Sequence, residues 1–172
     1  MSQAGEPSRT VVLGVGSELY ADDGVGVAVA RALAATELPA GVEVIEGHVG
    51  GLDLLFDMEG ADHVIIVDAV EMQREPGEVV VFTPDEVRLL PPGTVASLHH
   101  IGLEQVLEFA RLVGLQARLH VVGVQPASVA PGLALTDAAA RAVPVAVAQV
   151  RELVNAGGVD VAAHNDVGQG GS

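Results

Sequence analysis

The sequence predicts one three-layer α/β domain, in which a five-stranded, mostly parallel sheet is flanked by helices on both faces. Short runs of β-branched, apolar residues alternate along the chain with longer segments of helical period, and this alternation is typical of βαβ units. The chain has 172 residues, and 49% of them are hydrophobic, so one domain can bury its own core without disulfides or a structural metal.

Each expected strand is a short apolar run bounded by turn residues. The first strand enters a glycine-rich turn, and the third ends on the carboxylate of Asp68. The fourth follows a turn at Pro76 and Gly77 and is expected to lie at an edge of the sheet. In chain order, the expected strands are residues 10–16, 42–46, 63–68, 78–82 and 119–123.

The first and last expected helices begin at side chains that can accept hydrogen bonds from free backbone N–H groups. Asp22 or Asp23 opens the first helix, and Thr136 caps the last. Between them, the proline-containing residues 84–97 are expected to form a loop that leads to a histidine pair. In chain order, the expected helices are residues 23–35, 51–59, 102–113 and 136–154.

The domain is expected to span residues 10–155, because the two ends of the chain lack its pattern. Residues 1–9 are polar, and residues 156–172 turn to glycine and polar side chains, so both are expected to be disordered. Neither a secretory signal nor a membrane-spanning segment is recognisable, which favours a cytoplasmic protein with no membrane partner.

The composition excludes several classes of site. The chain has no cysteine, so disulfides, thiolate metal sites and a cysteine nucleophile are excluded, and any metal must be held by oxygen or imidazole. The formal net charge is -15, and all eight basic residues are arginines scattered along the chain. No nucleic-acid partner is therefore expected.

Three polar residues are expected to meet at one edge of the sheet. In open parallel sheets, ligands bind at the carboxyl ends of the strands, where the strand order reverses. The loop after the first strand leads to Asp23, the third strand ends at Asp68, and the loop before residue 102 brings His99. Two carboxylates and one imidazole suit a divalent ion such as nickel or zinc. Taken singly, each residue also has a structural interpretation, as a helix cap, a turn former or an inert surface histidine.

Four segments of the chain, taken in order, match the motifs of one known family. Residues 13–26 (LGVGSELYADDGVG) hold a strand, a glycine-rich loop and an acidic run, and residues 63–69 (HVIIVDA) end near a second acid. Residues 97–103 (SLHHIGL) contain H-x-x-G-L, and residues 119–126 (LHVVGVQP) contain G-[IV]-x-P. Together they resemble the nickel-iron hydrogenase maturation endopeptidases, from about residue 11 to residue 153.

The resemblance implies a function and a site. Enzymes of this family remove a short C-terminal extension from the precursor of the hydrogenase large subunit after nickel has been inserted, and they sense the nickel before they cleave. Asp23, Asp68 and His99 match the family's metal-contacting acid, second acid and histidine, so they are the expected catalytic and nickel-binding residues, with their individual roles unassigned. The nickel would arrive with the precursor and would not be a resident cofactor.

Three positions depart from the family's pattern. Ser17 stands where asparagine is usual, Asp23 stands where some members have glutamate, and His48 lies in a turn usually made of small residues. His48 could add a metal ligand or cap the second strand, and we favour the capping role. His100 is expected to matter little, because His99 has the motif's spacing to the following glycine.

Two other functions remain open. A non-enzymatic, nickel-sensing assembly factor would use the same three residues and would bind the precursor without shortening it. A nucleotide-binding module would use Gly14, Gly16 and Glu46, but Leu19 occupies the position of the third glycine in the G-x-G-x-x-G fingerprint.

Overall fold

The structure is a computed structural model that describes most of the chain. The predicted helix at residues 102–113 lies mostly outside the described part, as do nearly all residues of the two predicted disordered ends. Within the described part, no helix has the length and apolarity needed to cross a membrane. The described residues are 8–48, 53–88, 96–97, 108 and 110–157.

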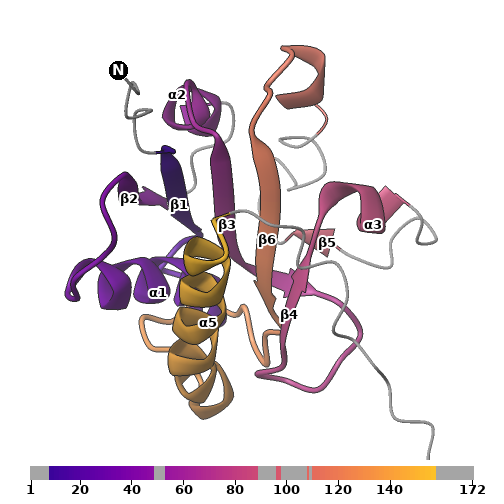
Figure 1. The fold of residues 1–172 in the computed structure, drawn as a ribbon. Coiled ribbons are helices and arrows are strands. Elements are labelled where there is room, and N and C mark those ends of the chain that lie inside the picture. Colours follow the sequence, from indigo (N-terminus) through magenta and orange to yellow (C-terminus); the bar gives the residue numbers. More distant parts are fainter. Residues whose placement is uncertain (1–7, 49–52, 89–95, 98–107, 109, 158–172) are drawn as a thin grey trace, which may run out of the picture.

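Strands and helices alternate along the first part of the chain, whereas the fourth strand follows the third directly (Figure 1). The elements are β1 (Thr10–Val15), η1 (Ala21–Gly24), α1 (Val25–Ala34), β2 (Val42–His48), α2 (Leu54–Met58), β3 (His63–Glu71), β4 (Val79–Phe82), α3 (Pro84–Arg88), β5 (Ala96–Ser97), β6 (Arg118–Val124) and α5 (Asp137–Asn155). The strand order is β2-β1-β3-β6-β4, in which only β4 is antiparallel to its neighbour. The predicted five-stranded, mostly parallel sheet is confirmed, and the short β5 adds an antiparallel pairing with β3.

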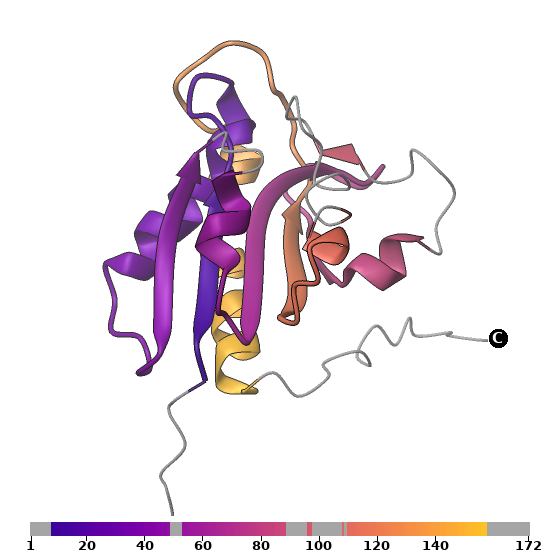
Figure 2. The same cartoon turned by 90° about the horizontal axis from the view of Figure 1, so that it is seen from above.

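Helices cover both faces of the sheet, which gives the three predicted layers (Figures 1 and 2). α1 and α5 contact each other and lie on one face, and Val12, Ile65 and Val122 point into the core beneath them. α2 lies on the other face, where its Leu54 and Met58 join a second core. Successive strand residues alternate between these two cores, as expected for a sheet that is buried on both sides.

Two glycines determine how closely α1 approaches the sheet. A Cβ atom on Gly26 would lie 2.3 Å from the carbonyl oxygens of both Val15 and Val67. A Cβ atom on Gly14 would lie 2.3 Å from the carbonyl oxygen of Gly26. Neither position accepts a side chain without moving the backbone. The first turn of α1 therefore lies directly against the carboxyl ends of β1 and β3.

The structure corrects the predicted end of the third strand. The prediction ended this strand at Asp68, but β3 continues to Glu71, so Asp68 lies inside the strand. The extension is stabilised by pairing, since Ala69 stays in register with β6 and residues 70–71 pair with β5.

The structure also corrects two helix boundaries. The predicted loop at residues 84–97 contains α3, which begins in a capping box. The Glu86 N–H donates to the Thr83 hydroxyl at 3.4 Å, and the Glu86 carboxylate accepts from the Thr83 N–H at 2.6 Å. At the first predicted helix, Asp22 and Asp23 lie in the 3-10 turn η1, and α1 starts only after it.

Candidate active site

Two of the three predicted site residues are described, and they lie on adjacent elements. Asp68 is in β3 and Asp23 is in η1, and their side chains are almost fully buried. η1 packs against β3, and the contact of Gly26 with the Val67 carbonyl brings the start of α1 beside the residue that precedes Asp68. The two acids therefore come from neighbouring elements at the carboxyl end of β1 and β3, where the strand order reverses.

The loop after β1 fixes the orientation of the Asp23 carboxylate. The Ser17 N–H donates to Asp23 Oδ2 at 2.9 Å, and the Ser17 hydroxyl accepts from the Leu19 N–H at 3.3 Å. The Asp23 N–H donates to the Tyr20 carbonyl at 3.0 Å, which closes the turn. A carboxylate that accepts a backbone N–H is held in one orientation. Ser17 thus belongs to the loop that positions Asp23.

Asp22, directly before Asp23, has a structural role that sequence reasoning missed. Its buried carboxylate accepts hydrogen bonds from the N–H groups of Ala127 (2.8 Å), Ser128 (3.2 Å) and Thr136 (2.7 Å) and from the Thr136 hydroxyl (2.7 Å). Burial alone would raise the pKa of Asp22, but these hydrogen bonds outweigh it and hold the pKa below its usual value. Asp22 therefore remains charged and ties η1 to the loop after β6 and to the start of α5.

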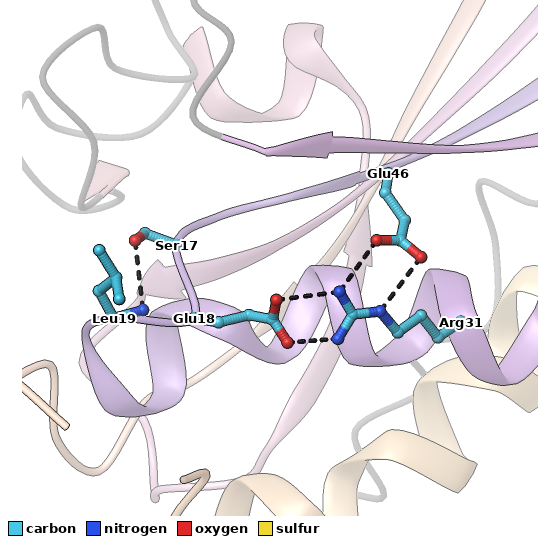
Figure 3. Close-up of polar contacts among 5 residues, drawn as sticks. All are labelled: Ser17, Glu18, Leu19, Arg31 and Glu46. Carbon is cyan, nitrogen blue, oxygen red and sulfur yellow. Dashed lines mark hydrogen bonds and ion pairs between the residues drawn. The ribbon is translucent and has the colours of Figure 1, made fainter. Parts of the chain in front are cut away.

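Arg31 of α1 connects the loop after β1 with the end of β2 (Figure 3). Its guanidinium donates to both carboxylate oxygens of Glu18 and to both of Glu46, the latter at 3.1 Å each. Hydrogen bonds to Glu18 and then to Glu46 raise the pKa of Arg31 above its usual value. Glu46 is one of the residues that the nucleotide-binding hypothesis would use, and in the structure it accepts hydrogen bonds from Arg31.

Of the three histidines discussed for the site, only His48 lies among the described residues. His99 and His100 lie outside the described residues. His48 is the last residue of β2, where it pairs with Val15 at the same edge of the sheet, and its capping role stays a prediction. Within the described ranges, no group of three or more histidine and acidic side chains could hold a metal ion. The role of Asp23, Asp68 and His99 as a nickel-binding set therefore stays a prediction.

The fold and the two buried acids define a class of protein. An open α/β sheet with the buried carboxylates of Asp23 and Asp68 beside the point where the strand order reverses is an arrangement of small α/β enzymes, which bind their ligands at that point.

Comparison with known proteins identifies the family. The model of the hydrogenase maturation protease family matches residues 27–153. The hydrogenase 2 maturation protease of Escherichia coli is 36% identical over 155 residues, which are 88% of this chain and 94% of that protein. The hydrogenase expression/formation protein HupD of Rhodobacter capsulatus is 35% identical over 159 residues, which are 91% of this chain and 76% of that protein.

Solved structures agree with the sequence relatives. The hydrogenase maturating endopeptidase HybD of E. coli has a TM-score of 0.74 at 33% identity and covers 87% of this chain and 94% of its own. HybD of Thermococcus kodakarensis has a TM-score of 0.72 at 27% identity, with coverages of 85% and 99%. The chain belongs to the hydrogenase maturation protease family, and it is a peptide-bond hydrolase.

This membership confirms the predicted family, fold and enzyme class, and it favours the protease over the assembly factor and the nucleotide-binding module. The matched range of the family model includes Asp68 but begins four residues after Asp23. The assignment of Asp23, Asp68 and His99 to the site stays a prediction from the sequence motifs, and the contact of η1 with β3 agrees with it for the two acids.

Proposed function

We propose that this protein removes a C-terminal extension from the precursor of a nickel-iron hydrogenase large subunit after nickel has been inserted, and that it does so in the cytoplasm. In this proposal the nickel is part of the substrate, and Asp23, Asp68 and His99 contact it when the precursor binds. Support comes from the family, whose E. coli relative is named hydrogenase 2 maturation protease.

The observation that carries the proposal is the burial of two carboxylates on adjacent elements. Two acids close together in a buried site repel each other, and a divalent cation placed between them offsets that repulsion. Carboxylate oxygen and imidazole nitrogen are suitable ligands for nickel, and three protein ligands leave coordination positions for the precursor. Asp23 and Asp68, with His99, fit a metal ion that arrives already bound to another protein.

The chemistry follows from holding the precursor by its metal. Once the nickel is fixed by three side chains, the peptide bond beside it is held in one place, which removes much of the entropic cost of reaction. Asp23 or Asp68 is then the candidate general base that takes a proton from the attacking water. That proton passes to the leaving amine as the peptide bond breaks. The hydrogen bond from the Ser17 N–H holds the Asp23 carboxylate in one orientation.

The test uses a purified precursor of a nickel-iron hydrogenase large subunit in nickel-loaded and nickel-free forms. Incubation with this protein is expected to shorten only the nickel-loaded form, which mass spectrometry detects as loss of one C-terminal peptide. Equal cleavage of both forms would contradict the role of nickel. An intact precursor that still binds would contradict the cleavage itself.

His99 and His100 offer a matched pair of variants for the same assay. His99→Ala is expected to lose processing, and His100→Ala is expected to keep it, since only the first has the motif's spacing. Equal loss of processing in both variants would contradict the assignment of His99.

A further inference from the structure

Four large apolar side chains are exposed on two loops at the carboxyl end of the sheet. Leu19 and Tyr20, in the loop after β1, are 62% and 48% exposed. Val129 and Leu133, in the loop after β6, are 37% and 82% exposed. We call these four residues the ledge. An exposed group of apolar side chains next to a site commonly marks an interaction surface.

Backbone hydrogen bonds join the two loops into one surface. The Gly132 N–H donates to the Leu19 carbonyl at 2.9 Å, and the Ala21 N–H donates to the Gly132 carbonyl at 2.8 Å. Tyr20 and Gly132 thereby form a parallel bridge, and the Asp22 N–H donates to the Ser128 carbonyl at 3.0 Å. Figure 2 shows the loop after β6 lying beside η1. The ledge is therefore preformed, with little backbone left to order on binding.

The ledge carries no charge in a chain whose formal net charge is -15. Residues 126–136 contain no acidic or basic side chain. The two acids next to the ledge are engaged elsewhere, because Glu18 is paired with Arg31 and Asp22 is buried among hydrogen-bond donors. Figure 3 shows Glu18 and Leu19 extending from the loop in different directions. An uncharged, apolar surface on so acidic a chain therefore fits an occupant that is itself uncharged and apolar.

The ledge adjoins the acids of the site through the same loop. The Leu19 N–H donates to the Ser17 hydroxyl, and the Ser17 N–H in turn donates to Asp23 Oδ2. We propose that the ledge binds an uncharged, apolar stretch of the precursor chain near the bond to be cleaved. The proposal rests on the proposed function, and it assigns the ledge to recognition of the polypeptide while the acids recognise the metal.

The test compares a ledge variant with a matched control. In the double variant Leu19→Ser/Leu133→Ser, KM for the nickel-loaded precursor is expected to rise roughly a hundredfold, since each leucine that becomes buried contributes about tenfold to binding. The kcat value is expected to stay within about twofold, because the lost contact is equal in the bound and transition states. The control is Phe56→Ser, which removes a 76% exposed side chain from α2, and it is expected to leave both constants unchanged.

Binding of the precursor is measured in parallel, so that the ledge is tested even if no cleavage occurs. Weaker binding by the double variant, with wild-type binding by Phe56→Ser, supports the ledge. Wild-type binding and KM in the double variant overturn it. If the wild-type protein shortens the precursor, the proposed function holds and the variants test only the ledge. If the wild-type protein does not shorten it, the proposed function is refuted, and the binding measurement still tests the ledge.

Self-association is the other occupant that the experiment distinguishes. Light scattering of the wild type and of Leu19→Ser/Leu133→Ser is expected to show the same molar mass for both. A wild-type dimer that the double variant abolishes would overturn the proposal, because the ledge would then bind a second copy of this chain.

Discussion

The two ends of the sheet both bury polar side chains, but they stabilise them in opposite ways. At the carboxyl end, four hydrogen bonds keep Asp22 charged. At the amino end, His63 Nε2 of β3 and His120 Nδ1 of β6 lie 2.8 Å apart, with the rings edge to face and their centroids 5.0 Å apart. Burial, together with the positive charge of His120 and Arg118, lowers the pKa of His63 to about 4, so this ring is neutral near pH 7.

The difference separates a region suited to chemistry from a region suited to stability. A buried polar group is tolerated either when donors compensate its charge or when the charge is removed. At the carboxyl end, hydrogen-bond donors compensate the charge of Asp22, so a charged group is retained beside the proposed position of the precursor. At the amino end the charge is removed, because the ring of His63 is neutral where it contacts His120 within the core. The comparison predicts that variants at the carboxyl end change activity, whereas those at the amino end change stability and its dependence on pH.

The largest effect is expected from the two acids of the candidate site. Asp23→Asn and Asp68→Asn, made separately, are expected to lower the rate of precursor processing by roughly a thousandfold, because each removes a carboxylate from the proposed chemistry. Thermal unfolding is expected to stay close to that of the wild type, since the amide has the same shape. Asp53→Asn, at an exposed aspartate before α2, serves as the control. Two fully active variants would contradict the site.

Asp22→Ala is expected to have the next largest effect, and this effect is a loss of stability. The substitution leaves the N–H groups of Ala127, Ser128 and Thr136 without their acceptor, which costs about 3 to 4 kcal/mol in the free energy of unfolding. Urea unfolding at pH 7 measures this loss. A change below about 1 kcal/mol would mean that these donors find other acceptors, and that Asp22 does not tie the two loops together.

The histidine pair predicts how stability depends on pH. Because the pKa of His63 is about 4 in the folded state and near 6.5 in the unfolded state, its contribution is complete above pH 6.5 and is lost as the pH falls toward 4. Between pH 6.5 and 4, the free energy of unfolding of His63→Gln is expected to fall by about 3 kcal/mol less than that of the wild type. The lowered pKa of Asp22 acts only at more acidic pH, so its contribution is lost in a separate, later step. Parallel pH curves for the two proteins would contradict this assignment.

Arg31→Ala is expected to have the smallest effect of the four. Its ion pairs with Glu18 and Glu46 are half exposed, so solvent weakens them, and little change in the melting temperature is expected. Processing is expected to fall by roughly two- to fivefold, because the loop that orients Asp23 loses its connection to α1 and β2. Arg111→Ala, which breaks a comparable exposed pair with Glu108, is the control. Equal effects of both variants would indicate that only net charge matters.

Much of the fold could be predicted from the sequence because it depends on local patterns. The β-branched runs at β1, β4 and β6 indicate strands wherever they lie in the chain, and Thr136 signals the start of α5 from its own position. The prediction failed where a local signal was overlooked or where pairing extended an element. The run from Thr83 to Glu86 is a capping box, but Pro91 and Pro92 led to the prediction of a loop there. β3 is longer than predicted because its last residues pair with β5 and β6.

The candidate site could be predicted only in part, because its supporting contacts are distant in sequence. Asp22 and Asp23 have the same side chain and the same local setting, and no local rule distinguishes them. The partners of Asp22 lie 105 to 114 residues away, so only the folded chain shows that it is structural. The contact between His63 and His120 likewise spans 57 residues and has no periodic signal.

The hydrogen bonds of Asp22 to the loop after β6 affect which residues of that loop can differ between related enzymes. Its carboxylate holds Ala127 and Ser128 at one end of the loop and Thr136 at the other. The stretch between them, which includes Val129 and Leu133, is therefore held at both ends, and Gly132 holds it again through its backbone hydrogen bonds to Leu19 and Ala21. Because these anchors are backbone groups, we expect that the exposed side chains of Val129 and Leu133 can vary between relatives while the path of the loop stays the same.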